Sequence, residues 1–286
     1  TLSVSIGYDW LYNDLSTASK NIIKEAILKK GLEPSMDAKY NGWLKASHNW
    51  NQVCNGGMAY GAMAIYEDEP ALSRTIINRA IESVGLPMKE YAPDGAYPEG
   101  YGYWGYGTSY NVMLISALEK AFGTDFRLPA MKGFLQTAGF MENMTGPSHS
   151  PFNFFDAGSG EELNPAMFWF ADKLKDPSLL WVERNHVKDS EAKKYVRNTL
   201  LPAIMIWSKG IMLNKIPAPA SNMCVGAVRN PVALMLSSWS DTAIYIGFKG
   251  GSPSLTHVHM DVVSFVSDAD GERLAMYFGF QNYDSL

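Results

Sequence analysis

The spacing of apolar residues predicts helices over most of the first 210 positions. Isoleucine, leucine and alanine recur there at intervals of three and four residues. Ser16 stands where a helix N-cap is favoured, and Gly31 and Gly85 follow the last apolar positions of two segments. The helical patterns cover 16–31, 49–66, 70–84, 128–143, 164–174 and 190–208. Short connections between successive helices favour a bundle or a ring of helical hairpins.

One segment interrupts this regularity with aromatic residues set among glycines. The sequence YPEGYGYWGYGTSYNVM spans 97–113 and has glycine at 100, 102, 105 and 107. Each glycine costs a helix roughly 1 kcal/mol relative to alanine, so we expect an irregular loop over this stretch. From Thr108 the apolar spacing becomes helical, and Gly123 marks its end. An aromatic loop that leads into a buried helix suits a sugar-binding cleft, and equally a surface loop without a ligand.

After position 210 the pattern changes from helical to alternating. The stretch 214–221 reads as a proline-containing linker, and five strand-like runs follow it. They lie at about 223–228, 232–239, 243–249, 257–267 and 273–280. We therefore expect an α+β chain in which 1–213 forms a helical domain and 214–286 begins an antiparallel β domain. Because about 65 residues of strand make a poor domain alone, we expect the chain to continue beyond Leu286.

Charge and cysteine content exclude some functions. The formal net charge of -5 provides no basic surface for nucleic acid. No apolar run approaches the ~20 residues that a membrane-spanning helix needs. Cys54 and Cys224 are predicted to be buried thiols, not a disulfide framework. The oligomeric state is left open.

Candidate chemistry lies in three places. In the predicted strand Thr256–Phe265, alternation puts His257, His259 and Asp261 on one face. These side chains could line a functional site or bind a zinc ion. The same face would also suit an exposed edge strand. The cluster Ser47–Gln52 opens a predicted helix, where Asn49 has the residue type of an N-cap. A third group in the loop 145–160 is placed to reach a cleft, although such residues are more often solvated: His149, Asn153 and Asp156.

Three of these motifs, in this order, resemble a known family. HNWNQVCNGG at 48–57, DGAYPEGYGYWGYG at 94–107 and the HxHxD strand look like the heparinase II/III-like polysaccharide lyases. The resemblance extends over nearly the whole chain, from YDWLY near the start to GFQNYDSL at the end. It implies an N-terminal (α/α) toroid followed by an antiparallel β-sandwich, here incomplete at its C-terminal end.

The resemblance also implies a reaction, the β-elimination of uronic-acid residues in acidic polysaccharides. Asn49 matches the amide that neutralises the sugar carboxylate, and Tyr106 matches the tyrosine that acts as base and then acid. His257 matches a catalytic imidazole contributed by the β domain. The substrate would be an acidic polysaccharide such as alginate or a glycosaminoglycan, and the location periplasmic or secreted from a bacterium.

Further roles follow from the same resemblance. His259 matches a ligand of a structural zinc ion. Six positions would contact sugar: His48, Trp50, Asn51, Glu99, Tyr103 and Trp104. The chain departs from the family pattern at several positions. Trp50 stands where a histidine is usual, so His48 would have to take over the role of that histidine. Tyr277 stands where the aspartate ligand of zinc is usual. Val263 stands where glycine is usual and Leu236 where arginine is usual, so reduced activity is also consistent with the sequence.

Two alternatives remain beside a lyase. An (α/α)-toroid glycoside hydrolase would need two carboxylates across the cleft, and Asp94 and Glu99 are the close pair in the central segment. A non-catalytic glycan-binding protein would fit the departures from the family pattern.

Overall fold

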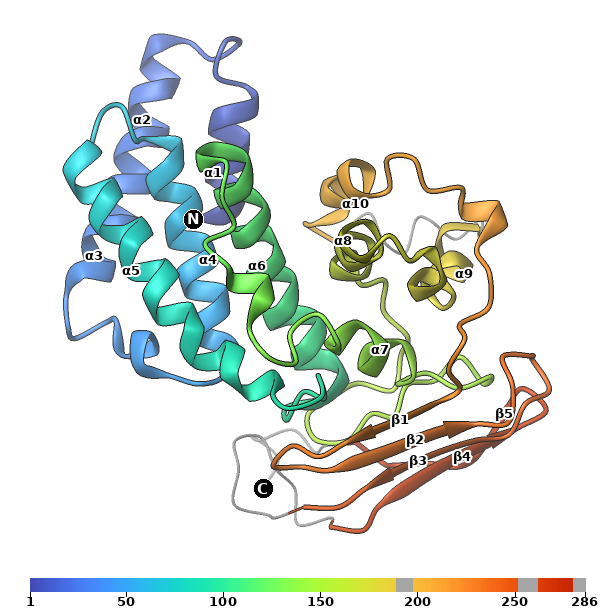
Figure 1. Ribbon diagram of the computed structural model, residues 1–286. Coiled ribbons are helices and arrows are strands. Elements are labelled where there is room, and N and C mark those ends of the chain that lie inside the picture. The colour runs from blue at the N-terminus through green and yellow to red at the C-terminus, as the bar shows by residue number, and fades with distance from the viewer. Residues whose placement is uncertain (189–197, 252–261, 280–286) are drawn as a thin grey trace. The chain divides into compact units, whose positions relative to one another are not determined.

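The computed structural model describes residues 1–188, 198–251 and 262–279. It confirms the α+β class, with helices first and a five-stranded antiparallel sheet after them (Figure 1). The chain forms two compact units, Thr1–Lys89 with Tyr110–Pro129, and Glu90–Ser109 with Ala130–Leu286. In the described part of the chain, no helix has the length and apolarity that crossing a membrane requires.

The first unit is helical. Its elements are α1 (Leu2–Trp10), α2 (Thr17–Ile27), a π-helical turn (Leu28–Leu32), α3 (Glu33–Met36), α4 (Asn49–Ala64) and α5 (Pro70–Met88). The predicted N-cap is confirmed, because the Ser16 hydroxyl accepts a hydrogen bond from the Ser19 N–H at 3.1 Å. The helical path continues past Gly31 and Gly85, where the sequence predicted ends.

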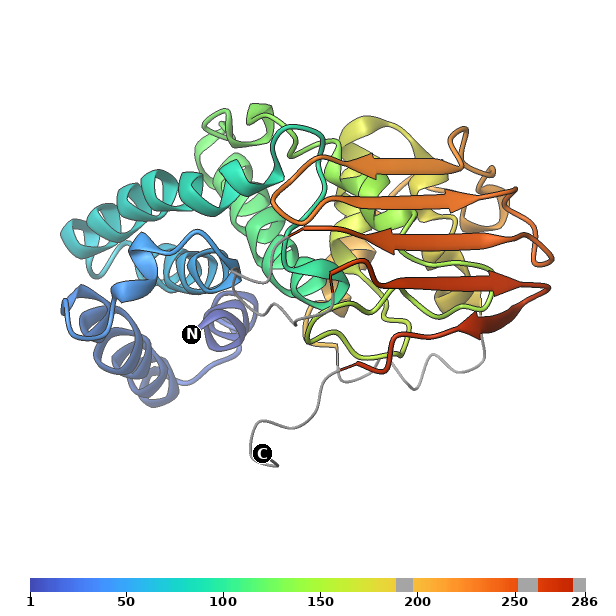
Figure 2. The same cartoon turned by 90° about the horizontal axis from the view of Figure 1, so that it is seen from below.

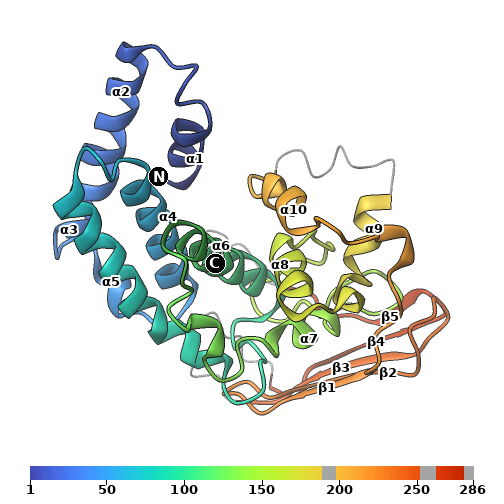
Figure 3. The ribbon, with the colours of Figure 1, turned by 45° about the horizontal axis from the view of Figure 1, so that its top comes forward.

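Helices α4 and α5 form an antiparallel hairpin, and α1 packs against α4 (Figure 3). The small residues of α4 allow close packing. A Cβ atom at Gly56 would lie 3.0 Å from the Tyr110 carbonyl oxygen. A side chain there would force the two backbones apart, so glycine serves close packing at this position.

The glycine-rich segment is helical, which corrects the prediction of a loop. Helix α6 spans Gly100–Phe122, with Gly102, Gly105 and Gly107 in its first turns, and it belongs to both units. A Cβ atom at Gly105 would collide with the Asn164 side-chain oxygen. The buried rings of Tyr101 and Trp104 anchor the same turns. Tertiary packing therefore outweighs the low helix propensity of glycine here.

In the second unit four shorter helices accompany the sheet: α7 (Thr137–Glu142), α8 (Pro165–Leu174), α9 (Glu183–Lys188) and α10 (Leu201–Trp207). The predicted helix 164–174 is confirmed. The predicted helix 128–143 is mostly wrong, because only a 3₁₀ turn at Leu128–Ala130 and α7 are helical. Gly133 interrupts it with φ of 86°. Residues 190–197 of the helix predicted at 190–208 lie outside the described residues.

The sheet has the order β1-β2-β3-β4-β5, and each strand is antiparallel to its neighbours. Figure 2 shows the strands side by side in this order. The strands are β1 (Met223–Gly226), β2 (Val232–Leu236), β3 (Tyr245–Lys249), β4 (Phe265–Ala269) and β5 (Glu272–Ala275). The strand predicted at 257–267 is described only from 262, and there β4 begins at Phe265. His257, His259 and Asp261 lie outside the described residues.

One face of the sheet packs on its own unit. Leu234, Tyr245 and Val266 point inward and are fully buried, and a Cβ atom at Gly247 would lie 2.7 Å from the Phe152 ring. The segment 145–157 therefore lies against this face. The outward row pairs Val225, Ala233, Phe248 and Phe265 across neighbouring strands.

The outward face is apolar and solvent-exposed. Val225, Phe248 and Phe265 are 58%, 39% and 52% exposed, and Met223, Met235 and Ile246 form a parallel exposed row. No described helix or strand of this unit lies over the face (Figure 2). A contiguous apolar surface of this kind is uncommon on a soluble protein.

A buried ion pair fixes the segment 145–157 to the inner face. Asp268 is 1% exposed and forms a salt bridge with Arg273, the two side chains coming from β4 and β5. The Ser148 hydroxyl donates to the same carboxylate at 2.6 Å. Arg273 also donates to the carbonyl oxygens of Ser150 and Pro151. The sheet thus supplies both charged groups, and the loop supplies a hydroxyl and two backbone carbonyl oxygens.

The two units do not follow the predicted domain boundary at 213/214, because α7–α10 belong with the sheet. The change from helix to strand itself falls where the pattern placed it, between α10 and β1.

Candidate functional site

The predicted carboxylate-binding amide opens α4. His48 is the N-cap residue and Asn49 is the first helical residue, so Asn49 is not the N-cap. Asn49 is fully buried, whereas the neighbouring Trp50 is 58% exposed. His48 is half-buried. The start of α4 thus presents an indole to solvent beside a buried amide.

Asn51 has a structural role, which corrects its assignment as a sugar contact. Its Nδ2 donates to the carbonyl oxygens of Leu44 and Ala46 and to Ser83, at 2.9–3.3 Å. Its Oδ1 accepts from Asn55 at 2.7 Å. These hydrogen bonds join α4 to α5 and to the turn that precedes α4.

The first turns of α6 divide their aromatic residues between two faces. Trp104 is fully buried, and its Nε1 donates to the Thr137 hydroxyl at 2.7 Å. Trp104 therefore belongs to the core and is not the sugar-facing ring that the sequence suggested. Tyr103 is half-buried and Tyr106 is 49% exposed. Three residues apart on a helix, these two side chains share a face.

The carboxylates proposed for a hydrolase are held in place by the protein. Asp94 accepts from the Ala227 N–H at 2.7 Å, and Glu99 accepts from the Tyr97 hydroxyl at 2.8 Å. Glu99 is 5% exposed. Burial and then the nearby Glu99 raise the pKa of Tyr97 well above its usual value. Both carboxylates fix the segment before α6, which weakens the hydrolase alternative.

The same segment lies at one particular end of the sheet. Asn230, in the β1–β2 turn, donates to the Pro98 carbonyl oxygen at 3.0 Å. A Cβ atom at Gly251, just after β3, would lie 2.7 Å from the Asn230 side-chain oxygen. The start of α6 and the beginning of the β3–β4 connection therefore meet at Asn230. That connection carries His257 in the sequence, although His257 itself lies outside the described residues.

The zinc site stays a prediction. His259 lies outside the described residues, and Tyr277, in the place of the usual aspartate, offers its backbone oxygen to Asn153 at 3.4 Å. Among the residues that the structure describes, no three His, Cys, Asp or Glu side chains converge as metal ligands. Both cysteines are free thiols, as expected, but each is half-buried instead of buried as predicted.

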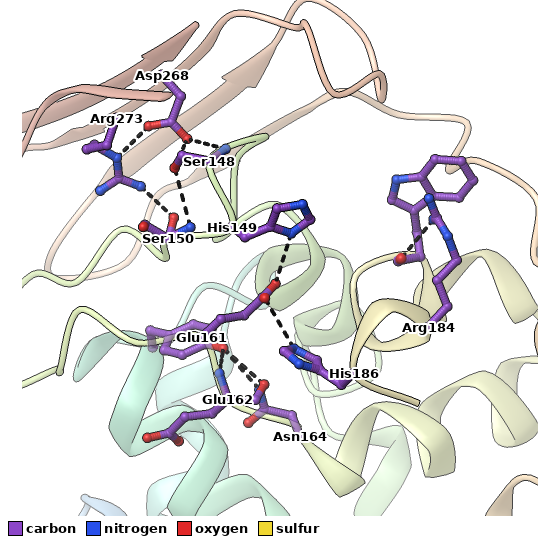
Figure 4. Close-up of polar contacts among 12 residues, drawn as sticks. Ser148, His149, Ser150, Glu161, Glu162, Asn164, Arg184, His186, Asp268 and Arg273 are labelled. Atoms are coloured by element: carbon purple, nitrogen blue, oxygen red, sulfur yellow. Dashed lines mark hydrogen bonds and ion pairs between the residues drawn. The ribbon is translucent and has the colours of Figure 1, made fainter. Parts of the chain in front are cut away.

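A polar pocket lies at the other end of the sheet, under the β2–β3 hairpin. It encloses about 380 Å³, part of it open to solvent. Three of its lining residues are His149, Glu161 and Arg184. Figure 4 shows the Glu161 carboxylate between two imidazoles. His149 Nδ1 lies 3.8 Å from one oxygen and His186 Nε2 lies 3.5 Å from the other.

The pocket has indole side chains on its walls. The Arg184 guanidinium carbon lies 3.1 Å from the centre of the Trp181 ring, and Arg184 Nη1 donates to the Trp181 carbonyl oxygen at 2.7 Å. Trp239, from the β2–β3 hairpin, is fixed by a hydrogen bond from its Nε1 to the Ser221 carbonyl oxygen at 2.9 Å. Asp241 lines the pocket from an exposed position in the same hairpin.

Charges of both signs meet in this pocket. The Glu161 carboxylate, 3.8 Å from His149 Nδ1, raises the pKa of His149, while partial burial opposes the change. Burial lowers the pKa of Arg184, and Asp241 acts in the opposite direction.

Sequence reasoning singled out His149 but missed Glu161, Arg184, His186 and Trp239. These residues are far apart in the chain and follow no spacing that periodicity can detect. The sequence predicted strands at 232–239 and 243–249, whereas β2 ends at Leu236 and β3 begins at Tyr245, so Trp239 and Asp241 lie in the connection between them.

One buried carboxyl in this unit makes stability depend on pH. Glu142, at the end of α7, is 6% exposed, and its Oε1 has no hydrogen-bond partner within the described part of the chain. Burial, and then the charge of Asp176, raise its pKa from 4.5 to about 8. The folded chain therefore holds a proton that the unfolded chain loses above pH 4.5, so folding stability falls until the folded group also ionises near pH 8.

We expect Glu142→Gln to remove this dependence. Relative to the parent, the variant should gain stability between pH 5 and pH 8, by on the order of a few kcal/mol. Urea unfolding at pH 5 and at pH 8 measures the difference in unfolding free energy between variant and parent. The same difference at both pH values would contradict a buried Glu142 that is protonated in the folded chain.

No family model matches the sequence. No curated protein matches it either. Among solved structures, the fold is similar to the crystal structure of heparan sulfate lyase HepC from Pedobacter heparinus, with a TM-score of 0.49 and 13% sequence identity. The match covers 90% of this chain and 34% of that one, so the chain spans about a third of its length.

Proposed function

We propose that this protein is a polysaccharide lyase that cleaves acidic, uronic-acid-containing polysaccharides by β-elimination. The proposal starts from the three sequence motifs that resemble the heparinase II/III-like lyases. In it, Asn49, Tyr106 and His257 act on the same sugar ring. The helical hairpins would belong to an (α/α) toroid, and the sheet to one half of a β-sandwich.

The chemistry requires two proton transfers and one charge neutralisation. A base removes the C5 proton, the C4–O bond breaks, and a C4–C5 double bond forms. The C5 proton is weakly acidic while the adjacent carboxylate is charged, so the Asn49 amide would stabilise the charge that develops there. A tyrosine phenol in water has a pKa near 10, so Tyr106 would first have to lose its proton. It would then take the C5 proton and afterwards protonate the leaving oxygen.

One observation supports this assignment above the others. Tyr106 is 49% exposed on a helix whose start is fixed by Asn230 next to the β3–β4 connection. The start of this helix thus meets Gly251, the last described residue before the part of the connection that carries the motif's histidine in the sequence.

The remaining expectations follow the same resemblance. We propose a periplasmic or secreted location. A structural zinc ion held by His259 stays part of the proposal, and no catalytic step depends on it.

A panel of acidic polymers tests the proposal. Heparan sulfate, chondroitin sulfate, hyaluronan, alginate and plant uronates are each incubated with the protein, and new double bonds are followed by ultraviolet absorbance. We expect at least one polymer to give unsaturated products. Products with saturated ends would indicate hydrolysis, and binding without products would indicate a non-catalytic glycan-binding protein. Either result would contradict the lyase.

A further inference from the structure

We propose that the pocket under the β2–β3 hairpin binds a neutral sugar ring, at a place separate from the proposed elimination site. The proposal rests on this pocket alone and holds whether or not the chain is a lyase. Its residues come from the segment 145–161, the start of α9 and the hairpin. All of them belong to the second unit.

Topology separates this pocket from the proposed catalytic residues. It lies where β2 ends at Leu236, whereas Asn230 and the start of α6 lie where β2 begins. A five-residue strand spans roughly 13 Å or more, so a single sugar ring cannot occupy both places. The pocket therefore is not part of the proposed elimination site.

The walls suit a flat, partly apolar ligand. Trp239 is held by its bond to Ser221, so the ring is ordered before any ligand arrives. One face of Trp181 is already covered by Arg184, which leaves Trp239 as the indole available for stacking. The C–H face of a pyranose packs on such a ring with little loss of side-chain entropy.

The polar groups supply hydrogen bonds in both directions. Arg184 uses one N–H for the Trp181 carbonyl oxygen and has others to donate. Asp241 is an exposed carboxylate that accepts from hydroxyl groups. Adjacent hydroxyls of a sugar can satisfy a donor and an acceptor together, which a purely apolar ligand cannot do.

Charge decides between a neutral and an acidic sugar. Two carboxylates, Glu161 and Asp241, line the pocket against one permanent cation, Arg184. A uronate would bring a third negative charge close to Asp241. We therefore expect the pocket to prefer a neutral ring, in contrast to the substrate proposed for the other end of the sheet.

Matched methyl glycosides provide the test. Methyl glucoside and methyl glucuronide differ only at C6, and galactose and mannose pairs extend the comparison. Ligand-observed NMR by saturation transfer measures each on the complete chain. We expect at least one neutral glycoside to bind at millimolar concentration and its uronide partner to bind more weakly. Absence of binding by every neutral glycoside, or tighter binding of the uronides, would overturn the proposal.

Variants locate the binding. Trp239→Ala should weaken it about tenfold, because the stacked indole is lost. Trp10→Ala is the matched control, since Trp10 is an exposed indole in the other unit. Asp241→Asn should reduce the difference in affinity between neutral sugars and uronides. Because Asp241 is exposed and outside the core, this variant still tests the pocket if Trp239→Ala fails to fold. Unchanged binding in both pocket variants would place the sugar elsewhere and refute the proposal.

An elimination assay on the same variants keeps the two proposals apart. Trp239→Ala should leave polymer cleavage unchanged. Lack of cleavage by the parent would count against the lyase only, and lack of glycoside binding would count against the pocket only.

Discussion

Tyr106→Phe is expected to lower the rate of polysaccharide cleavage by about 10²–10⁴-fold, because a general acid–base catalyst is removed while the ring stays. Tyr106 is 49% exposed, so the substitution changes no fully buried side chain of the core. The measurement is kcat and KM with the polymer that gives unsaturated products.

Tyr103→Phe is the matched control for this prediction. It is the same change, three residues earlier on the same helix face, at a position predicted only to contact sugar. We expect a larger effect on KM than on kcat there. Equal losses of kcat in the two variants, or none in Tyr106→Phe, would remove Tyr106 from the chemistry.

Arg273→Met is expected to destabilise the second unit by roughly 3–5 kcal/mol, because it leaves a buried charge on Asp268 without its partner. Asp268 is 1% exposed, and its other oxygen accepts from Ser148 at 2.6 Å. Arg273 also joins the sheet to the segment 145–157 through two carbonyl oxygens. Chemical denaturation of parent and variant measures the loss.

The double variant Asp268→Leu with Arg273→Met distinguishes a lost ion pair from lost packing. The double variant should lose less stability than Asp268→Leu and Arg273→Met lose together, because no unpaired ion is then left buried. Ser148→Ala should cost less than Arg273→Met, because the ion pair itself survives. Additive effects of the two single changes would show that the pair is not energetically coupled.

The sequence predicted those elements whose apolar spacing was long and regular. Helices α4, α5 and α8 and the order of helices before strands follow directly from it. The alternation also placed β2 and β3 within a few residues. In these segments the local pattern and the tertiary packing favour the same structure.

The sequence failed where packing overrides local propensity. In α6, glycine is favoured at position 105 because the Asn164 side chain approaches the helix closely there, and no rule on helix propensity contains that information. Trp104 was assigned to sugar contact by the family resemblance, but its hydrogen bond to Thr137 belongs to the core. Glu161, with its two imidazole neighbours, depends on contacts between residues distant in the chain.

The exposed rows on the outer face of the sheet have a consequence for handling the protein. Water in contact with Val225, Phe248 and Phe265 is released whenever two such faces meet, which favours association entropically. Concentrated samples should therefore scatter more light than dilute ones, and the tendency should grow on warming from refrigerator to room temperature. A lysine in place of Phe248 would interrupt the row at its centre and reduce this effect without touching the buried side of β3.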